Sequence, residues 1–188
     1  IDTATDCILA ENFHPESGLV NASYPAQATP TLYTWKNVQM ESNWSGIEYS
    51  FASFLLENGR YKEAARIVET VERRHTQNGR RFNHEECGEH YYRALASWAM
   101  LQSLTGLKAD MPREKLSFSP ALPELTAPWF VPGAYGKLSI AEKKIRIECL
   151  GGCLNLKQLA LRTEMEKAVV TVGGAAACTQ TYENGVLT

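Results

Sequence analysis

The sequence has no apolar run that approaches the roughly 20 residues needed to cross a bilayer as a helix, and it has no long block of one charge. Its 19 basic and 21 acidic residues give a formal net charge of -2 at pH 7. The densest basic positions, Arg73–Arg74 and Arg80–Arg81, flank a predicted helix end, where cations interact favourably with the helix dipole. These features indicate neither a membrane span nor a nucleic-acid partner.

The five cysteines are unevenly spaced. The odd number of cysteines and their spacings match no disulfide framework: Cys7, Cys87, Cys149, Cys153 and Cys178. The C-x3-C pair at 149 and 153 has neither a second pair nor a nearby histidine, so the sequence predicts no zinc site. Reduced structural thiols favour a reducing compartment, and we therefore expect a cytoplasmic location.

The chain begins at Ile1 without a methionine, and Val186–Thr188 has the pattern of an unfinished strand. Because both ends look interrupted, we expect a piece of a longer protein. The first ten residues carry no basic n-region, so they do not predict a signal peptide. The hydrophobic content of 44% and the charged content of 21% are typical of a soluble globular protein with a core.

Helical periodicity begins near residue 43. A helix capped by Asn43 or Ser45 is predicted to run to just before Gly59, which is a natural C-cap. A second helix is predicted over residues 61–75, so that the two form an αα-hairpin. A third is predicted from about Cys87 to Thr105. We expect three antiparallel helices whose apolar stripes bury Phe51, Phe54, Val68, Leu95 and Trp98.

After Pro112 the apolar period changes to two, which is typical of strands. Strands are predicted over residues 116–118, 144–147, 154–157, 158–162 and 169–172. Helices first and strands later indicate an α+β chain rather than alternating βαβ units. We therefore divide the chain into a helical part, residues 1–112, and a small antiparallel β-rich region, residues 113–188.

Residues 13–40 follow neither period, and they contain His14, Tyr24, Tyr33 and Trp35. A connection this long inside a compact domain is usually functional or disordered. Aromatic rings suit stacking on the flat apolar faces of sugars. The same rings can equally pin the loop to the core.

The most polar stretch, residues 83–93, contains three carboxylates, two imidazoles and one guanidinium. On a helix Glu86, His90 and Arg93 share one face, because they lie at i, i+4 and i+7. Carboxylate and guanidinium together suit a sugar hydroxyl, which both donates and accepts hydrogen bonds. One alternative is a solvated helix start, whose acids favour the dipole. Another is a metal site at His84, Glu86 and His90, which lacks the H-E-x-x-H spacing.

Residues 83–107, NHEECGEHYYRALASWAMLQSLTGL, closely resemble the C-terminal motif of glycoside hydrolase family 116, which contains β-glucosidases and non-lysosomal glucosylceramidases. The segment Trp44-Ser-Gly46-Ile-Glu-Tyr49 resembles a helix start in that family. Leu116-Ser-Phe-Ser-Pro120 resembles the exit of the chain from its helices. The resemblance covers residues 30–120 and weakens toward both ends.

This resemblance implies a partial (α/α)6 toroid of helical hairpins, followed by the β region. It implies part of a retaining glycosidase that cleaves β-linked sugars with two carboxylates and no cofactor. In that family the catalytic carboxylates lie upstream of the matched segments, so we expect them outside this chain. The expected partners are the carbohydrate substrate and the remainder of the same enzyme.

By resemblance, Glu86 and Arg93 bind the sugar, and Glu85, His84 and Trp44 lie near the pocket. The sequence departs from the family pattern at two of its positions. His84 stands where one family acid is found, counting back from Arg93, and Ser42 stands where members often carry a glutamate before the tryptophan. The alternative function is a non-catalytic carbohydrate-binding or scaffold subunit of the same fold.

Overall fold

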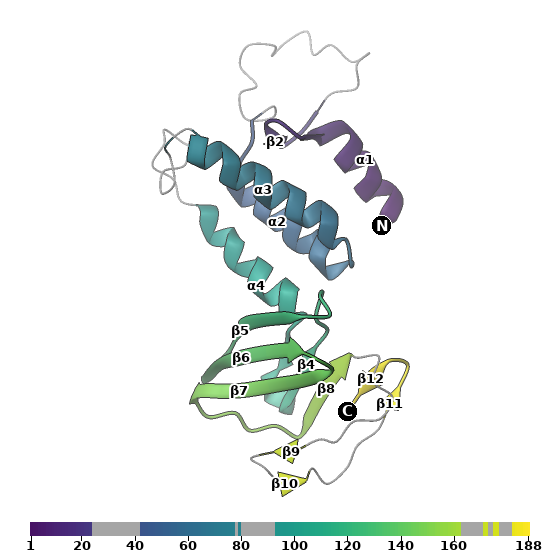
Figure 1. Cartoon of the computed structure of the whole chain (residues 1–188), viewed down its shortest axis with the longest axis vertical. Coiled ribbons are helices and arrows are strands. Elements are labelled where there is room, and N and C mark those ends of the chain that lie inside the picture. Colours follow the sequence, from purple (N-terminus) through teal and green to yellow (C-terminus); the bar gives the residue numbers. More distant parts are fainter. Residues whose placement is uncertain (24–41, 78, 80–92, 163–170, 173–174, 177–181) are drawn as a thin grey trace. The chain divides into compact units, whose positions relative to one another are not determined.

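The computed structural model describes residues 1–23, 42–77, 79, 93–162, 171–172, 175–176 and 182–188 (Figure 1). The chain separates into two compact units, Ile1–Met100 and Leu101–Thr188.

The first unit is built on an antiparallel helical hairpin. Helix α2 (Ser45–Glu57) packs along helix α3 (Tyr61–Gln77) (Figure 1). Gly59, with a φ of 75°, lies in the turn between them, as the sequence predicts. The buried apolar side chains come from Ala52, Leu55 and Leu56 of α2 and from Ala64, Ile67 and Val71 of α3.

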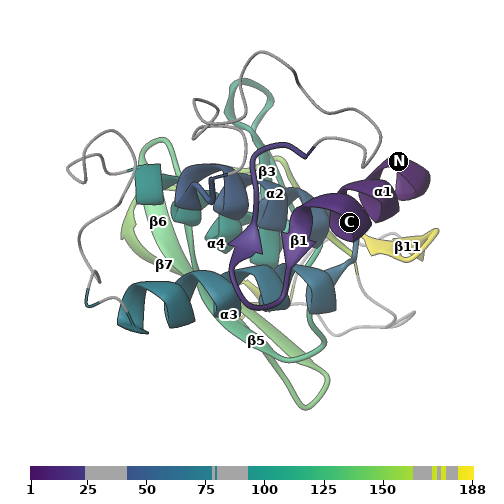
Figure 2. The ribbon, with the colours of Figure 1, turned by 90° about the horizontal axis from the view of Figure 1, so that it is seen from above.

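A short β-hairpin follows the first helix of this unit. Helix α1 (Asp2–Asn12) leads into β1 (Phe13–His14), which pairs antiparallel with β2 (Gly18–Leu19). Strand β2 lies against α3 (Figure 2). Arg60 joins α1 to the start of α3, because its guanidinium contacts Asp6 at 2.6 Å and Glu63 at 2.8 Å.

The predicted third helix and its buried stripe are partly wrong. Arg93–Ala96 form a 3-10 turn, η1, and helix α4 covers Ser97–Thr105, whereas the predicted part at 87–92 lies outside the described residues. Leu95 is 61% exposed and Trp98 is 69% exposed, so neither belongs to the core. Phe54 is also exposed, and Phe51 and Val68 are half-buried. In α2 the buried face lies one position further along the chain than the predicted stripe of Phe51 and Phe54. It consists of Glu48, Ala52 and Leu55, which repeat at i, i+4 and i+7.

The expected toroid is also wrong. The described residues contain four α-helices, and these do not form a ring of hairpins. Only α2 and α3 pair along their lengths, while α4 is short and is followed by strands. The expectation came from the motif resemblance, whereas the periodicity by itself predicted only an α+β chain.

The second unit contains two larger sheets and one isolated hairpin. The five-stranded sheet has the order β11-β12-β8-β4-β3, and the three-stranded sheet has the order β5-β6-β7. Their strands are β3 (Lys108–Asp110), β4 (Lys115–Phe118), β5 (Leu125–Val131), β6 (Ala134–Ala141), β7 (Lys144–Gly152), β8 (Gln158–Arg162), β11 (Tyr182–Glu183) and β12 (Val186–Leu187). A 3-10 turn, η2 (Met111–Arg113), lies between β3 and β4, and β9 (Thr171–Val172) pairs with β10 (Ala175–Ala176). The pairing is antiparallel except between β4 and β8, which run parallel.

The core of this unit lies between the two larger sheets. Strand β4 contributes Leu116 and Phe118, strand β5 contributes Trp129, and strand β6 contributes Leu138, all at most 1% exposed. The rings of Phe118 and Trp129 meet edge to face, with centroids 6.4 Å apart. This arrangement is favourable for aromatic pairs and joins the sheets at their centre.

The strand predictions had mixed outcomes. Those at 116–118, 144–147 and 158–162 are confirmed by β4, β7 and β8. The one at 154–157 is wrong, because these residues form an irregular connection into β8. Strand β5 was not predicted, since Pro128 interrupts its pattern. The structure shows why the proline is tolerated: β5 is an edge strand, where one side of the backbone needs no partner.

Gly136 on β6 permits a close approach of three strands. A Cβ at this position would lie 1.8 Å from the carbonyl oxygen of Glu148 and 2.4 Å from the Trp129 ring. We expect Gly136→Ala to lower the free energy of unfolding by about 1–3 kcal/mol, because the strands must separate to admit the methyl group. Urea unfolding measures this change.

Gly133→Ala is the matched control for that experiment. Nothing lies within 4 Å of a Cβ at Gly133, so its cost comes only from the φ of 85°. That cost is about 1 kcal/mol. If Gly136→Ala destabilises the protein no more than Gly133→Ala does, the close approach at Gly136 does not contribute to the free energy of unfolding.

Candidate functional site

A buried carboxylate lies one turn into α2, within the segment that resembles the family's helix start. Glu48 is 0% exposed. Its Oε1 accepts hydrogen bonds from the backbone N–H of Leu19, at 3.0 Å, and from Nη1 of Arg74, at 3.1 Å. Its Oε2 accepts a hydrogen bond from Nη2 of Arg74. Both carboxylate oxygens are therefore engaged within the protein.

Arg74, near the end of α3, also holds the β1–β2 hairpin. Its Nη1 donates to the carbonyl oxygen of Ser17 at 2.6 Å, and the neighbouring Arg73 donates to the carbonyl oxygen of Pro15. The sequence suggested that these arginines only complement the helix dipole. The structure shows in addition that Arg74 forms a buried ion pair linking α2, α3 and the hairpin.

Gly18 is required where the hairpin meets this ion pair. Its φ is 110°, and a Cβ there would lie 2.4 Å from Oε1 of Glu48 and 2.5 Å from Nη1 of Arg74. A side chain would therefore displace both charged groups. We call the arrangement of Glu48, Arg74 and residues 17–19 the hairpin clamp.

The segment that enters α2 is fastened to the same region. The backbone N–H of Asn21 donates to the carbonyl oxygen of Ser42 at 3.0 Å, which joins the chain after β2 to the chain before α2. Ser45 Oγ and His75 Nε2 lie 3.1 Å apart, within hydrogen-bonding distance. Trp44 is the N-cap residue of α2 and is half-buried. The hairpin clamp and these bonds fix the position of Trp44 relative to α3.

Burial dominates the electrostatics of Glu48. Removal from water raises the pKa of its carboxyl above the ordinary value of 4.5, and the hydrogen bond and charge of Arg74 offset that rise only in part. Burial also raises the pKa of the neighbouring Tyr49, and the charge of Glu48 adds to the rise. A carboxylate that is enclosed and fully hydrogen-bonded is suited to holding structure, not to contacting a substrate.

The raised pKa of Glu48 sets the direction of a pH dependence. The native state binds this proton more tightly than the unfolded chain does, so the contribution to stability is complete below about pH 4.5 and is lost as the pH rises through the native pKa. Glu48→Gln lacks this titration. We expect the stability of the wild type relative to Glu48→Gln to fall as the pH rises, measured as the difference between their melting temperatures. A difference that is independent of pH, or that grows with pH, would contradict the prediction.

Most of the site residues predicted from sequence lie outside the described residues. His84, Glu85 and Glu86 fall in an undescribed range, and only the backbone of Arg93 is described, at the start of η1. Trp44 is the one whose side chain is described. The sugar-binding assignment of all five residues therefore stays a prediction. Glu48 was missed because its position between Ile47 and Tyr49 hides the buried i, i+4, i+7 series to which it belongs.

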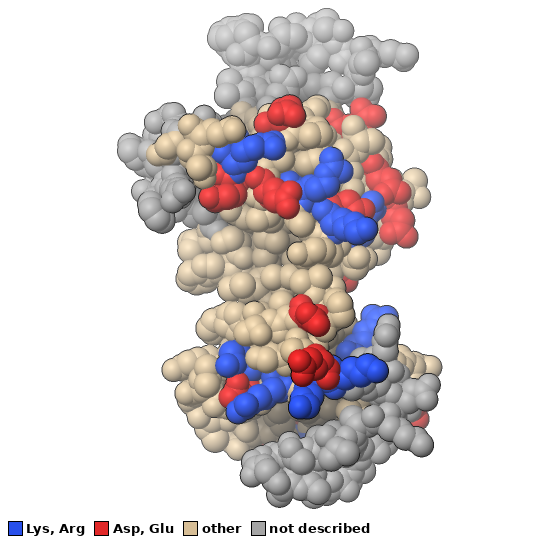
Figure 3. Space-filling view, in the orientation of Figure 1, with Lys and Arg blue, Asp and Glu red and all other residues tan. Residues whose placement is uncertain are grey.

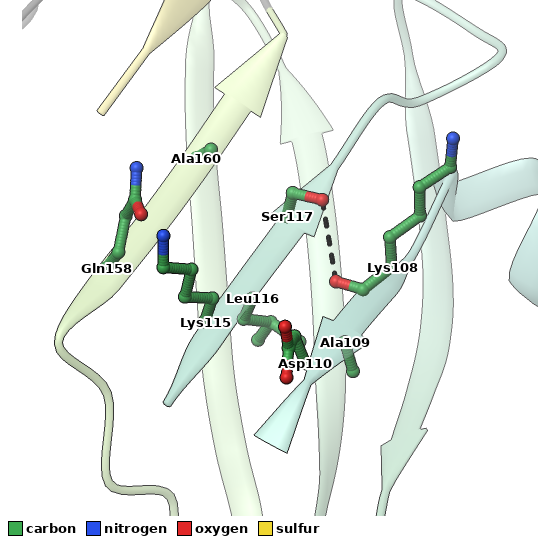
Figure 4. A pocket seen from close by; sticks show the side chains of 8 residues that line it. All are labelled: Lys108, Ala109, Asp110, Lys115, Leu116, Ser117, Gln158 and Ala160. Carbon is green, nitrogen blue, oxygen red and sulfur yellow. Dashed lines mark hydrogen bonds between the residues drawn. The ribbon is translucent and has the colours of Figure 1, made fainter. Parts of the chain in front are cut away.

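Other features of the described residues provide no stronger site. A shallow depression of about 300 Å³ lies over β3, β4 and β8, and Figure 4 shows its lining, including Lys108, Asp110 and Gln158. Its polar side chains do not converge on one point. The described residues contain no group of three potential metal ligands, and no described helix is both long enough and apolar enough to span a membrane.

A comparison with models of known protein families finds no match to this chain, and a search of curated proteins finds no significant similarity.

Proposed function

We propose that this chain is the C-terminal, sugar-contacting part of a retaining glycosidase that acts on β-linked sugars. In this proposal Glu86 and Arg93 bind the sugar hydroxyls, with Glu85, His84 and Trp44 near the pocket. The nucleophile and the acid/base carboxylate lie outside these 188 residues. The reaction needs no cofactor, because two carboxylates about 5–5.5 Å apart suffice for a retaining mechanism.

One observation carries the proposal: the motifs that resemble the family occur at element boundaries of the expected kind. The Trp44 motif coincides with the start of α2, because Trp44 is its N-cap residue. The long polar motif ends at Leu107, two residues after the end of α4. The exit motif coincides with β4. The three motifs thus meet a helix start, a helix end and a strand in the order that the resemblance implies.

In this proposal the buried charges of the hairpin clamp, Glu48 and Arg74, hold part of the sugar site in position. A sugar site needs side chains held to within about 0.5 Å of their working positions. Trp44 lies at the end of α2 that the hairpin clamp and the Ser45–His75 contact hold against α3. We infer that Glu48 and Arg74 act on the sugar indirectly, as positioning residues for Trp44.

Hydrolysis of an aryl β-glucoside by the intact polypeptide that contains this chain tests the proposal. We expect turnover, and NMR of the first-formed sugar should show the β anomer, because two displacements restore the configuration. An inverted product would contradict the retaining mechanism. Absence of both hydrolysis and glucoside binding would contradict the proposal as a whole.

A second candidate is a non-catalytic carbohydrate-binding subunit. One observation favours it: His84 and Ser42 stand at two positions where the family carries acids. This candidate predicts binding of the aryl glucoside without turnover. The same experiment therefore separates the two functions.

A further inference from the structure

The three-stranded sheet β5-β6-β7 has one face directed away from its core. Strand β5 presents Phe130 and strand β6 presents Tyr135, which are 51% and 52% exposed. The two residues are direct partners across the strands, so their side chains lie on the same face. On the opposite face, Trp129 and Leu138 belong to the core.

The Tyr135 ring lies against a glycine. Tyr135 is paired with Gly151 of β7, and a Cβ at Gly151 would lie 2.4 Å from the ring. The absence of a side chain at Gly151 lets the ring rest on the strand, with its other side open. Together with Phe130 it forms an exposed aromatic surface on a rigid antiparallel sheet.

A charged group lies beside these rings. Lys137, two positions along β6 from Tyr135, pairs across the strands with Glu148 of β7 and contacts it at 3.1 Å. Arg146, two positions from Glu148, contacts its other carboxylate oxygen at 2.9 Å. Residues two apart on a strand are separated by about 6.8 Å and neighbouring strands by about 4.8 Å. Lys137 therefore lies about 7 Å from Tyr135, and Arg146, which pairs with Ser139, lies about 14 Å from Tyr135, so the rings and charges span a length that suits an oligosaccharide rather than a single sugar.

The charges on this face are unbalanced. Glu148 divides its two oxygens between Lys137 and Arg146, and Lys144, also on this face, adds a further exposed cation. The guanidinium and ammonium groups have more donors than one carboxylate can accept. Figure 1 shows β5, β6 and β7 in front of β4 and β8, and Figure 3 shows basic and acidic groups close together over this region in the same orientation.

We propose that the surface formed by Phe130, Tyr135, Lys137 and Arg146 binds an acidic oligosaccharide, one that carries carboxylates on its sugar rings. The flat rings match the apolar faces of sugars, and the excess of donors and positive charge matches carboxylate acceptors. No single segment of the sequence contains these aromatic and basic residues together, because they come from three strands that the register of the sheet places side by side. This proposal is independent of the hydrolase reaction, because it concerns binding of an oligosaccharide and requires no turnover.

Binding of a fluorescent galacturonic acid hexamer to the full chain tests this surface, with a cellulose hexamer as the neutral competitor. We expect the acidic hexamer to bind, with an affinity that falls as salt is added, and the neutral hexamer to compete weakly. Tyr135→Ala should weaken binding by about tenfold, and Tyr135→Phe should retain it, because the ring supplies the contact. Tyr61→Ala, which removes an exposed tyrosine from the start of α3, should leave binding unchanged.

Arg146→Gln tests the charge. It should weaken binding by about three- to tenfold at low salt and reduce the salt dependence. Arg113→Gln is the matched control, since Arg113 is also an exposed arginine paired with one acid, Asp110, at 2.7 Å. Equal binding of the two hexamers, or no binding of either, would overturn the proposal. Self-association that Tyr135→Ala abolishes would show that a second copy of the chain covers this face instead.

Discussion

Glu48→Ala is expected to lower the free energy of unfolding of the first unit by about 3–5 kcal/mol, the usual cost of breaking a buried ion pair from one side. The substitution leaves the guanidinium of Arg74, only 12% exposed, without its carboxylate. It also removes the acceptor of the Leu19 N–H. Glu48→Gln should cost less, because the amide imitates the protonated carboxyl and keeps an acceptor for Leu19. Urea unfolding of the variants measures both.

Two controls make that experiment decisive. Arg113→Ala breaks an exposed ion pair and should barely change stability, because solvent screens such pairs. The double variant Glu48→Leu with Arg74→Met removes both buried charges and should recover much of the stability lost in Glu48→Ala. If Glu48→Ala costs no more than Arg113→Ala, the hairpin clamp does not hold the unit together.

Arg93→Ala is expected to lower kcat/KM for an aryl β-glycoside by about 10- to 1000-fold in the intact enzyme, if its hydrogen bonds to the sugar strengthen in the transition state. Arg93→Lys should restore little, because an ammonium group cannot reproduce the bidentate geometry of a guanidinium. The melting temperature should change little in either variant. This prediction rests on the motif resemblance, and the structure supplies only the backbone position of Arg93 in η1.

The opposite result identifies a purely structural arginine. A solvated helix start predicts a lowered melting temperature with an unchanged kcat/KM. Arg113→Ala again serves as the control, since it lies in the second unit and should alter neither quantity.

The parts of the fold that were predictable depend on local patterns. The apolar spacing and Gly59 specify α2 and α3, and alternation specifies β4, β7 and β8. Strand β5 escaped prediction because a proline is compatible with a strand only at an edge, and edge position is a property of the whole sheet. The toroid failed because resemblance supplied it without support from the helical stripes.

The candidate site was less predictable than the fold. Glu48 and Arg74 are far apart in the sequence and look like ordinary helix-surface charges. Only the packing of α2 on α3, with Gly18 admitting the hairpin, shows that they meet in the interior. The aromatic surface of the second unit likewise depends on the register that places Phe130 opposite Tyr135 and Tyr135 opposite Gly151.

The parallel pairing of β4 with β8 has a consequence for the order of folding. Residues 119–157, including the whole β5-β6-β7 meander, lie between these two strands. The meander forms by contacts between sequence neighbours, whereas the β4–β8 pair must close this entire segment at a larger entropic cost. We therefore expect the meander to form early and the β4–β8 pair to form late. Substitutions in β8 should then mainly accelerate unfolding, while substitutions at the turns of the meander should mainly slow folding.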